Sequence, residues 1–151
     1  LSTFKLQQNF TIDSTMEDFL PTLPTFKQNL KILTGANEIA DHIAATYGVV
    51  AIGNGGDTTS LQSTGLNSFV RMKTGIIPNV AGSSLIYNVS FTGAEIPSSG
   101  VSELGIFKTG SNTTGTTPPD GILLSRVTFT NTGVVGSSDT VSFQVRIEVG
   151  S

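Results

Sequence analysis

The chain has 151 residues, of which 37% are hydrophobic and 13% are charged, and its formal net charge is −3 at pH 7. A chain of this length forms one domain with a sizeable core. It contains no cysteine, which excludes disulfides, thiolate metal sites and cysteine nucleophiles, and its net negative charge argues against nucleic-acid and anionic-membrane partners. We expect no membrane span and, since residues 1–5 read LSTFK, no signal peptide.

The first 35 residues show no regular helical or strand periodicity. An alternation of apolar residues is interrupted at Gln8, and two prolines further on favour extended backbone. We therefore predict an extended N-terminal arm over 1–35, followed by a β-sandwich domain over 36–151. The residues expected to make assembly contacts from the arm are Phe4, Leu6, Phe10, Ile12, Pro21 and Pro24.

One or two short helices are predicted between the arm and the strands. Phe26, Leu30 and Leu33 have helical spacing, and Gly35 is placed to end that helix. A clearer apolar stripe covers 37–47, with Gly48 as its end. The members of this stripe are Ile39, Ala40, Ile43, Ala44 and Tyr47.

A glycine cluster then follows an apolar run, in the stretch AIGNGGDTTSLQSTGL at 51–66. Gly53 and Gly55 fit a dinucleotide-binding loop, but Thr58 stands where the third glycine is needed, and no lysine or arginine lies nearby. Phosphate binding is therefore not expected. The glycines instead allow unusual backbone angles as the chain leaves a strand, so the stretch is predicted to be a loop.

From residue 49 onward the hydrophobic period becomes two. The last candidate strand is the clearest, because apolar and polar residues alternate throughout it. Six such strands separated by turn-forming residues predict a mainly β fold, either an antiparallel β-sandwich or a small barrel. The candidate strands are 48–53, 66–73, 84–91, 101–108, 121–130 and 140–149.

The strands at 101–108 and 121–130 are apolar on both faces, yet they carry Glu103 and Arg126. An antiparallel register with Phe107 opposite Ile122 puts these two charges opposite each other. We expect a buried structural pair: loss of one partner should cost about 3–5 kcal/mol, whereas replacement of both by apolar residues should be nearly neutral. A catalytic role for Glu103 is not expected, because no second carboxylate or histidine is in sequence reach.

Catalytic constellations are nearly absent. His42 is the only histidine and lies beside Asp41 on a predicted helix, where a solvated side chain is the ordinary interpretation. No carboxylates pair convincingly for acid–base chemistry, and no calcium-loop series of ligands occurs. The chain is therefore predicted not to be an enzyme, with no catalytic residue, no metal site and no cofactor.

The loop TGSNTTGTTPPDG, at 109–121, contains no apolar side chain except its prolines and joins two strongly apolar strands. Such a loop is expected to project as an exposed tip and to be the surface that faces outward or meets a receptor. Its residues singled out for exposure are Ser111, Asn112, Thr113, Thr114, Pro118 and Pro119.

Four stretches, in order, resemble a recurrent domain of tailed-bacteriophage virion proteins: YGVVAIGNGGDTTSLQSTGL, VSELGIFKTG, DGILLSRVTF and DTVSFQVRIEV. The resemblance covers about 47–149. Ser125 stands where the family pattern has alanine before arginine, and the loop 109–120 is longer than expected. The resemblance implies a structural protein without catalytic residues that occurs on the head surface or in the tail or fibre attachment.

Composition agrees with that implication, because serine and threonine make up about a quarter of the chain and charges are few. We therefore expect a virion structural protein, made and assembled in the host cytoplasm, that acts as capsid decoration or cement or in tail or fibre attachment. Decoration is slightly favoured because the arm could clasp a lattice. Expected partners are other virion proteins and further copies of the chain, for example in a trimer, with a host-surface glycan as a further candidate. The alternative is a β-sandwich carbohydrate-binding module.

Overall fold

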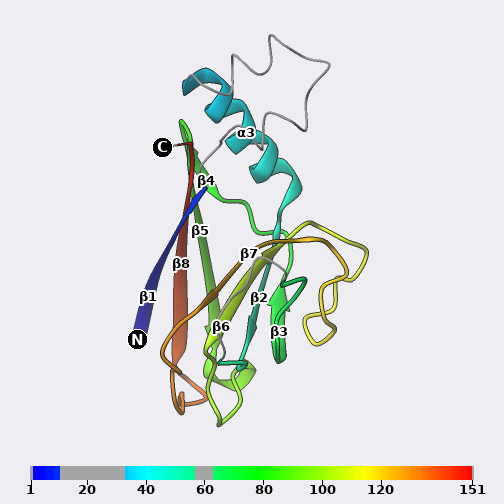
Figure 1. Cartoon of the computed structure of the whole chain (residues 1–151). Coiled ribbons are helices and arrows are strands. Elements are labelled where there is room, and N and C mark those ends of the chain that lie inside the picture. Colours follow the sequence, from blue (N-terminus) through cyan, green and yellow to red (C-terminus); the bar gives the residue numbers. More distant parts are fainter. Residues whose placement is uncertain (1, 11–32, 57–62, 151) are drawn as a thin grey trace.

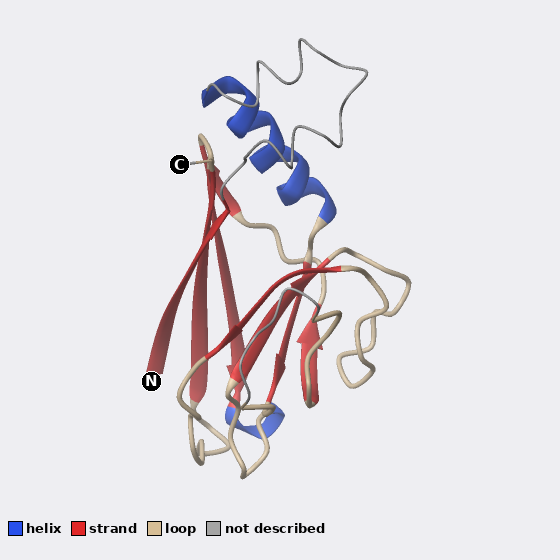
Figure 2. Cartoon of the chain, in the orientation of Figure 1, coloured by secondary structure: helices blue, strands red, loops and turns tan. Residues whose placement is uncertain are grey.

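The computed structural model describes residues 2–10, 33–56 and 63–150, and it is mainly β (Figures 1 and 2). It contains two four-stranded sheets, with strand orders β1-β8-β5-β4 in sheet A and β3-β2-β6-β7 in sheet B. The strand pairs are antiparallel except that β1 runs parallel to β8. The predicted mainly β fold is confirmed.

Sheet A is built around two long strands in which buried and more exposed residues alternate. The strands β5 and β8 match predicted segments closely. The short β4 has no counterpart in the prediction because three residues are too few to show a period of two, and β1 lies in the stretch predicted as an extended arm. The strands of sheet A are β1 (Ser2–Phe10), β4 (Asn79–Ala81), β5 (Ser84–Thr92) and β8 (Thr140–Val149).

Sheet B contains shorter strands, each of which lies inside a predicted segment. Its two central strands, β2 and β6, are buried along their whole length. At β3 the strand begins later than predicted, because residues 67 and 68 direct their backbone N–H groups to a side chain instead of to a neighbouring strand. The strands of sheet B are β2 (Val49–Gly53), β3 (Phe69–Lys73), β6 (Glu103–Phe107) and β7 (Leu123–Thr128).

One α-helix, α3 (Leu33–Thr46), occurs in the part of the chain that the structure describes, together with the short 3-10 helix η1 (Gly93–Glu95). The helix lies across one end of sheet A (Figure 1) and buries Ala36, Ala40 and Ile43. It therefore covers the predicted 37–47 stripe except Tyr47, and it begins earlier, so the helix end predicted at Gly35 is wrong. Packing of Ala36 beside Gly150, at the end of β8, outweighs the low helix propensity of glycine.

The main hydrophobic core includes buried residues from both sheets and from α3. Its largest fully buried side chains are Tyr87, Phe91 and Phe143. The Tyr87 hydroxyl donates a 2.8 Å hydrogen bond to the Tyr47 carbonyl oxygen, so even this buried phenol has a partner. Burial, with a smaller effect of Tyr47, raises the pKa of Tyr87 and keeps the phenol protonated. The bond fastens the chain just after α3 to sheet A.

The expected arm overlaps β1. Phe4, Leu6 and Phe10 occupy register positions opposite Phe143, Val145 and Val149 of β8. Three other residues of the expected arm, Ile12, Pro21 and Pro24, lie outside the described residues, as does most of the first predicted helix. The division of the chain at residue 35 stays a prediction.

Candidate functional site

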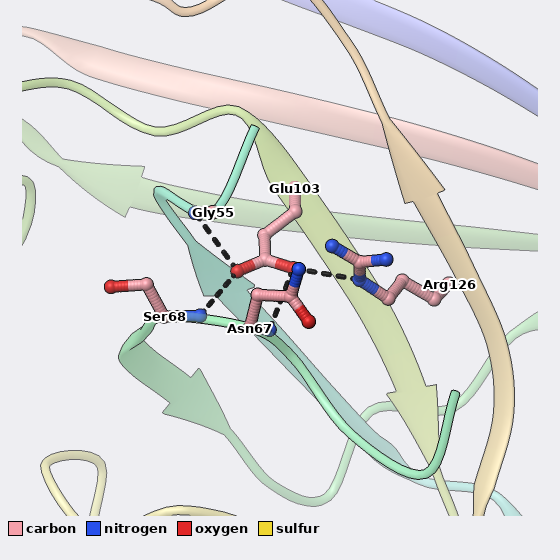
Figure 3. Close-up of polar contacts among 5 residues, drawn as sticks. All are labelled: Gly55, Asn67, Ser68, Glu103 and Arg126. Atoms are coloured by element: carbon pink, nitrogen blue, oxygen red, sulfur yellow. Dashed lines mark hydrogen bonds and ion pairs between the residues drawn. The ribbon is translucent and has the colours of Figure 1, made fainter. Parts of the chain in front are cut away.

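A buried carboxylate lies at the start of β6, on the face of sheet B opposite the main core. Glu103 is fully buried, and both of its oxygens accept hydrogen bonds (Figure 3). Oε1 accepts from the backbone N–H groups of Ser68 at 2.8 Å and Gly55 at 3.0 Å. Oε2 accepts from the Asn67 N–H at 3.1 Å and from Arg126 Nε at 2.7 Å. We call these five residues the Glu103 cluster.

The Glu103–Arg126 ion pair is present, with side-chain exposures of 0% and 2%, but the register predicted for it is wrong. Glu103 lies opposite Thr128, and Arg126 lies opposite Gly105. The register shifts between Ile106 and Phe107, and a sequence alignment of apolar positions does not anticipate this irregularity. The two charges meet as diagonal neighbours, because an arginine side chain is long enough to reach two residues along the partner strand.

The glycine cluster belongs to the same site. A Cβ atom at Gly53 would overlap the Ser68 carbonyl oxygen and lie 2.5 Å from Glu103 Oε1. A Cβ atom at Gly55 would lie 2.5 Å from Asn67 Cβ and 2.7 Å from the same carboxylate oxygen. Neither glycine has positive φ, so the expectation that these glycines serve unusual backbone angles is wrong for both. They are needed because a buried carboxylate and a second loop come close to the backbone.

The Glu103 cluster can hold the fold together but offers little to a substrate. A carboxylate has about four acceptor sites, and four donors are already directed at its two oxygens. No group of three or more His, Cys, Asp or Glu side chains able to hold a metal ion occurs among residues 33–56 and 63–150. His42 lies exposed on α3, as expected for a solvated helix residue. The arrangement is that of a polar structural centre.

The predicted exposed loop is organised around Asp120. Its carboxylate accepts hydrogen bonds from the Ser111 hydroxyl and from the backbone N–H groups of Ser111 and Asn112, the latter at 3.1 Å. The Ser111 hydroxyl, followed by the Asn112 N–H, holds the pKa of Asp120 below its usual range. Ser111, Thr113, Thr114 and Pro118 are exposed, whereas Asn112 and Pro119 are half-buried. The loop is thus exposed and internally braced.

This loop also covers part of a sheet edge. The Gly115 carbonyl oxygen accepts a 2.9 Å hydrogen bond from the N–H of Met72 in β3, the outer strand of sheet B. In Figure 1 the loop, drawn in yellow, extends beside β3. Covering an edge strand in this way limits edge-to-edge pairing with another chain.

A second polar contact joins β3 of sheet B to η1, which follows β5 of sheet A. Lys73 Nζ lies 3.3 Å from the Glu95 carboxylate and 5.1 Å from the centre of the Phe91 ring. Burial acts to raise the pKa of Glu95, but the Thr92 N–H and Lys73 outweigh it, so the pKa is lowered. Lys73 and Glu95 are far apart in sequence, and no local pattern could have paired them.

The outer face of sheet A carries a row of uncharged hydrogen-bonding groups. Ser90 and Ser142 hydroxyls are 2.8 Å apart, and Gln144 Nε2 donates to Asn88 Oδ1 at 3.1 Å. Cross-strand pairs of this kind stabilise a sheet while leaving its surface hydrated. We call these four residues the polar ladder.

Comparison of the chain with protein-family models gives no match, and neither does comparison with curated protein sequences. In the part of the chain that the structure describes, no helix is long and apolar enough to cross a membrane. The function below is therefore a proposal, and it rests on the motif resemblance and on the geometry described above.

Proposed function

We propose that this chain is a non-enzymatic structural protein of a tailed-phage virion, with a β-sandwich fold and an N-terminal arm. It would assemble symmetrically as capsid decoration or cement, or in tail or fibre attachment. The observation that carries the proposal is the Glu103 cluster. Three of the four stretches that resemble phage virion proteins contribute to it, through Gly55, Glu103 and Arg126.

The cluster supports a structural role because it accounts for the two buried charged residues of these stretches, Glu103 and Arg126, without a substrate. Glu103 and Arg126 bind each other, and the loop N–H groups bind the carboxylate. The resemblance therefore extends to residues that determine how the chain folds. Since the buried cluster serves the fold, we expect the outer surfaces of the protein to make its contacts with other molecules.

Two surfaces support assembly in particular. The polar ladder presents hydroxyl and amide groups, which cost less to desolvate at a contact than unpaired charges would. The loop 109–121 presents eight exposed residues from a braced frame, as suits a contact that must keep its shape.

Immunogold electron microscopy tests the proposal. Antiserum raised against the purified chain is applied to particles of the phage whose genome encodes the chain. Label over heads would support decoration, and label over the tail or its tip would support attachment. Label on no particle, while the chain is detected in the same lysate, would refute a virion role.

Deletion of residues 1–24 tests the arm in the same system. Among the residues whose burial is described, the main core runs from Ala36 to Val149. The truncated chain, which lacks β1, should therefore still unfold cooperatively but label particles less. Loss of cooperative unfolding would show that residues 1–24 belong to the folded domain.

The polar ladder is also the one observation that favours a carbohydrate-binding module, since hydroxyl and amide groups can bind sugar hydroxyls. Against it, Tyr87 is fully buried and the chain has no tryptophan to stack on a sugar ring. Titration of the purified domain with soluble sugars distinguishes the two functions. Saturable binding that is lost in Gln144→Ala would favour the module.

A further inference from the structure

The N-terminal strand occupies a position from which it can be exchanged between chains. β1 is the outermost strand of sheet A and pairs with β8 along its whole length, from Ser2 opposite Val141 to Phe10 opposite Val149. In Figure 1 it lies along the outer side of β8. Its removal would leave β8, β5 and β4 in their order, so the rest of the sheet does not depend on which chain supplies it.

The edge of β8 needs an occupant. Without β1, the ten-residue strand Thr140–Val149 would become an outer strand whose alternate residues, from Val141 to Val149, are buried and apolar. A long, regular strand at a sheet edge pairs readily with any available extended segment. Residues 2–10 satisfy this edge, in one register, whichever copy of the chain they come from.

The segment between β1 and α3 is long enough for β1 to pair with β8 of its own chain or of a neighbouring copy. Residues 11–32 join β1 to α3, and a segment of that length can span at most about 75 Å. Its length therefore permits β1 to reach a neighbouring molecule. The backbone hydrogen bonds would be the same within one chain and between chains, so the outcome depends on the effective concentration of the chain's own β1, which is on the order of millimolar for linked binding segments in general.

We propose that the edge of β8 is a binding site for β1 of a second copy of this chain, in the same parallel register. Dilute molecules keep β1 on their own sheet. Molecules held close together, at millimolar local concentration or above, exchange it and become linked. The proposal concerns copies of this chain alone, and it stands or falls independently of the proposed virion function.

Single cysteines test the exchange, because the natural chain has none. Gln7→Cys and Arg146→Cys are opposite each other in the register, and Arg146 is exposed. The two single variants, one isotopically labelled, are mixed, unfolded and refolded together over a range of concentrations. A short thiol-reactive cross-linker is added, and intact mass spectrometry counts the mixed dimers. The matched control pairs Gln7→Cys with Thr113→Cys, which is exposed in the loop 109–121.

If strands exchange, mixed dimers of the register pair rise with concentration and exceed the control several-fold near 1 mM. Circular dichroism confirms that each variant folds, and a chain carrying both Gln7→Cys and Arg146→Cys shows whether the register is correct. The proposal is overturned if that double variant cross-links only within one chain while the mixed pair stays at the control level at every concentration. It is also overturned if the double variant does not cross-link at all.

Discussion

Replacement of Glu103 by glutamine should destabilise the protein severely. Gln has one acceptor oxygen and one NH₂ group, so donors that now meet the second carboxylate oxygen would face another donor. Arg126, with only 2% of its side chain exposed, would also lose its compensating charge. Breaking a buried ion pair from one side costs about 3–5 kcal/mol. Since domains of this size have a total stability of about 5–15 kcal/mol, the loss is a large fraction of the whole.

Urea unfolding, monitored by circular dichroism, measures this cost. In thermal unfolding the melting temperature should fall by about 6–20 °C, because a loss of 1 kcal/mol lowers it by about 2–4 °C in a domain of this length. Glu148→Gln is the matched control. That glutamate pairs with Arg146 on the surface, where the two side chains are 26% and 50% exposed, so its loss should cost at most about 1 kcal/mol. Equal costs for the two substitutions would refute the reasoning.

The geometry also predicts an asymmetry within the pair. After Arg126→Met the Glu103 carboxylate keeps its three backbone donors, so this substitution should cost less than Glu103→Gln. The same three donors change the expectation for replacing both charges by apolar residues. In the double variant these three N–H groups would lose their acceptor, so its free energy of unfolding should be lower than that of the parent. A double variant as stable as the parent would mean that water satisfies all three N–H groups.

Three further substitutions or conditions test other parts of the structure. Gly53→Ala, which puts a methyl group against the buried carboxylate, should cost about 1–3 kcal/mol in urea unfolding, whereas Gly65→Ala, with open space around it, should be nearly neutral. The lowered pKa of Asp120 means that bracing of its loop is complete above about pH 4 and is lost as the pH falls through the lowered value, so the NMR amide protection of Ser111 should decrease in acid. Insertion of six Gly/Ser residues after the exposed Thr113 should change the unfolding free energy by less than about 1 kcal/mol, and a larger loss would show that the tip is part of the core.

Much of the fold could be predicted from the sequence because its signals are local. The alternation in β8 and β5 is regular over nine or more residues, and the buried alternate positions match it. The three-residue β4 could not be found in this way. The start of α3 was missed because a glycine near its beginning is tolerated when neighbouring residues pack against a sheet.

The site was predictable only in part, for a different reason. Glu103 and Arg126 could be joined from the sequence because they are an acid and a base on two strongly apolar strands, although the register assumed for the pairing was wrong. The pair survives the different register because the arginine side chain reaches two residues along the partner strand. The register depends on an irregularity beside Phe107, which no alternation records. The remaining donors are backbone N–H groups of Gly55, Asn67 and Ser68, and backbone groups leave no trace in residue identity.

The glycine cluster shows how a loop that lacks phosphate-binding chemistry can still bind an anion. Backbone N–H groups of a glycine-rich loop are suited to a negative charge, and here Gly55 donates to the carboxylate of the chain's own Glu103. An external phosphate would have to displace an anion that is covalently attached, already paired with Arg126 and fully buried. That competition favours the internal carboxylate strongly, because attachment gives it a high effective concentration. Gly53 and Gly55 of this loop are therefore committed to the fold. We expect recognition by this protein to use exposed surfaces such as the polar ladder and the loop 109–121.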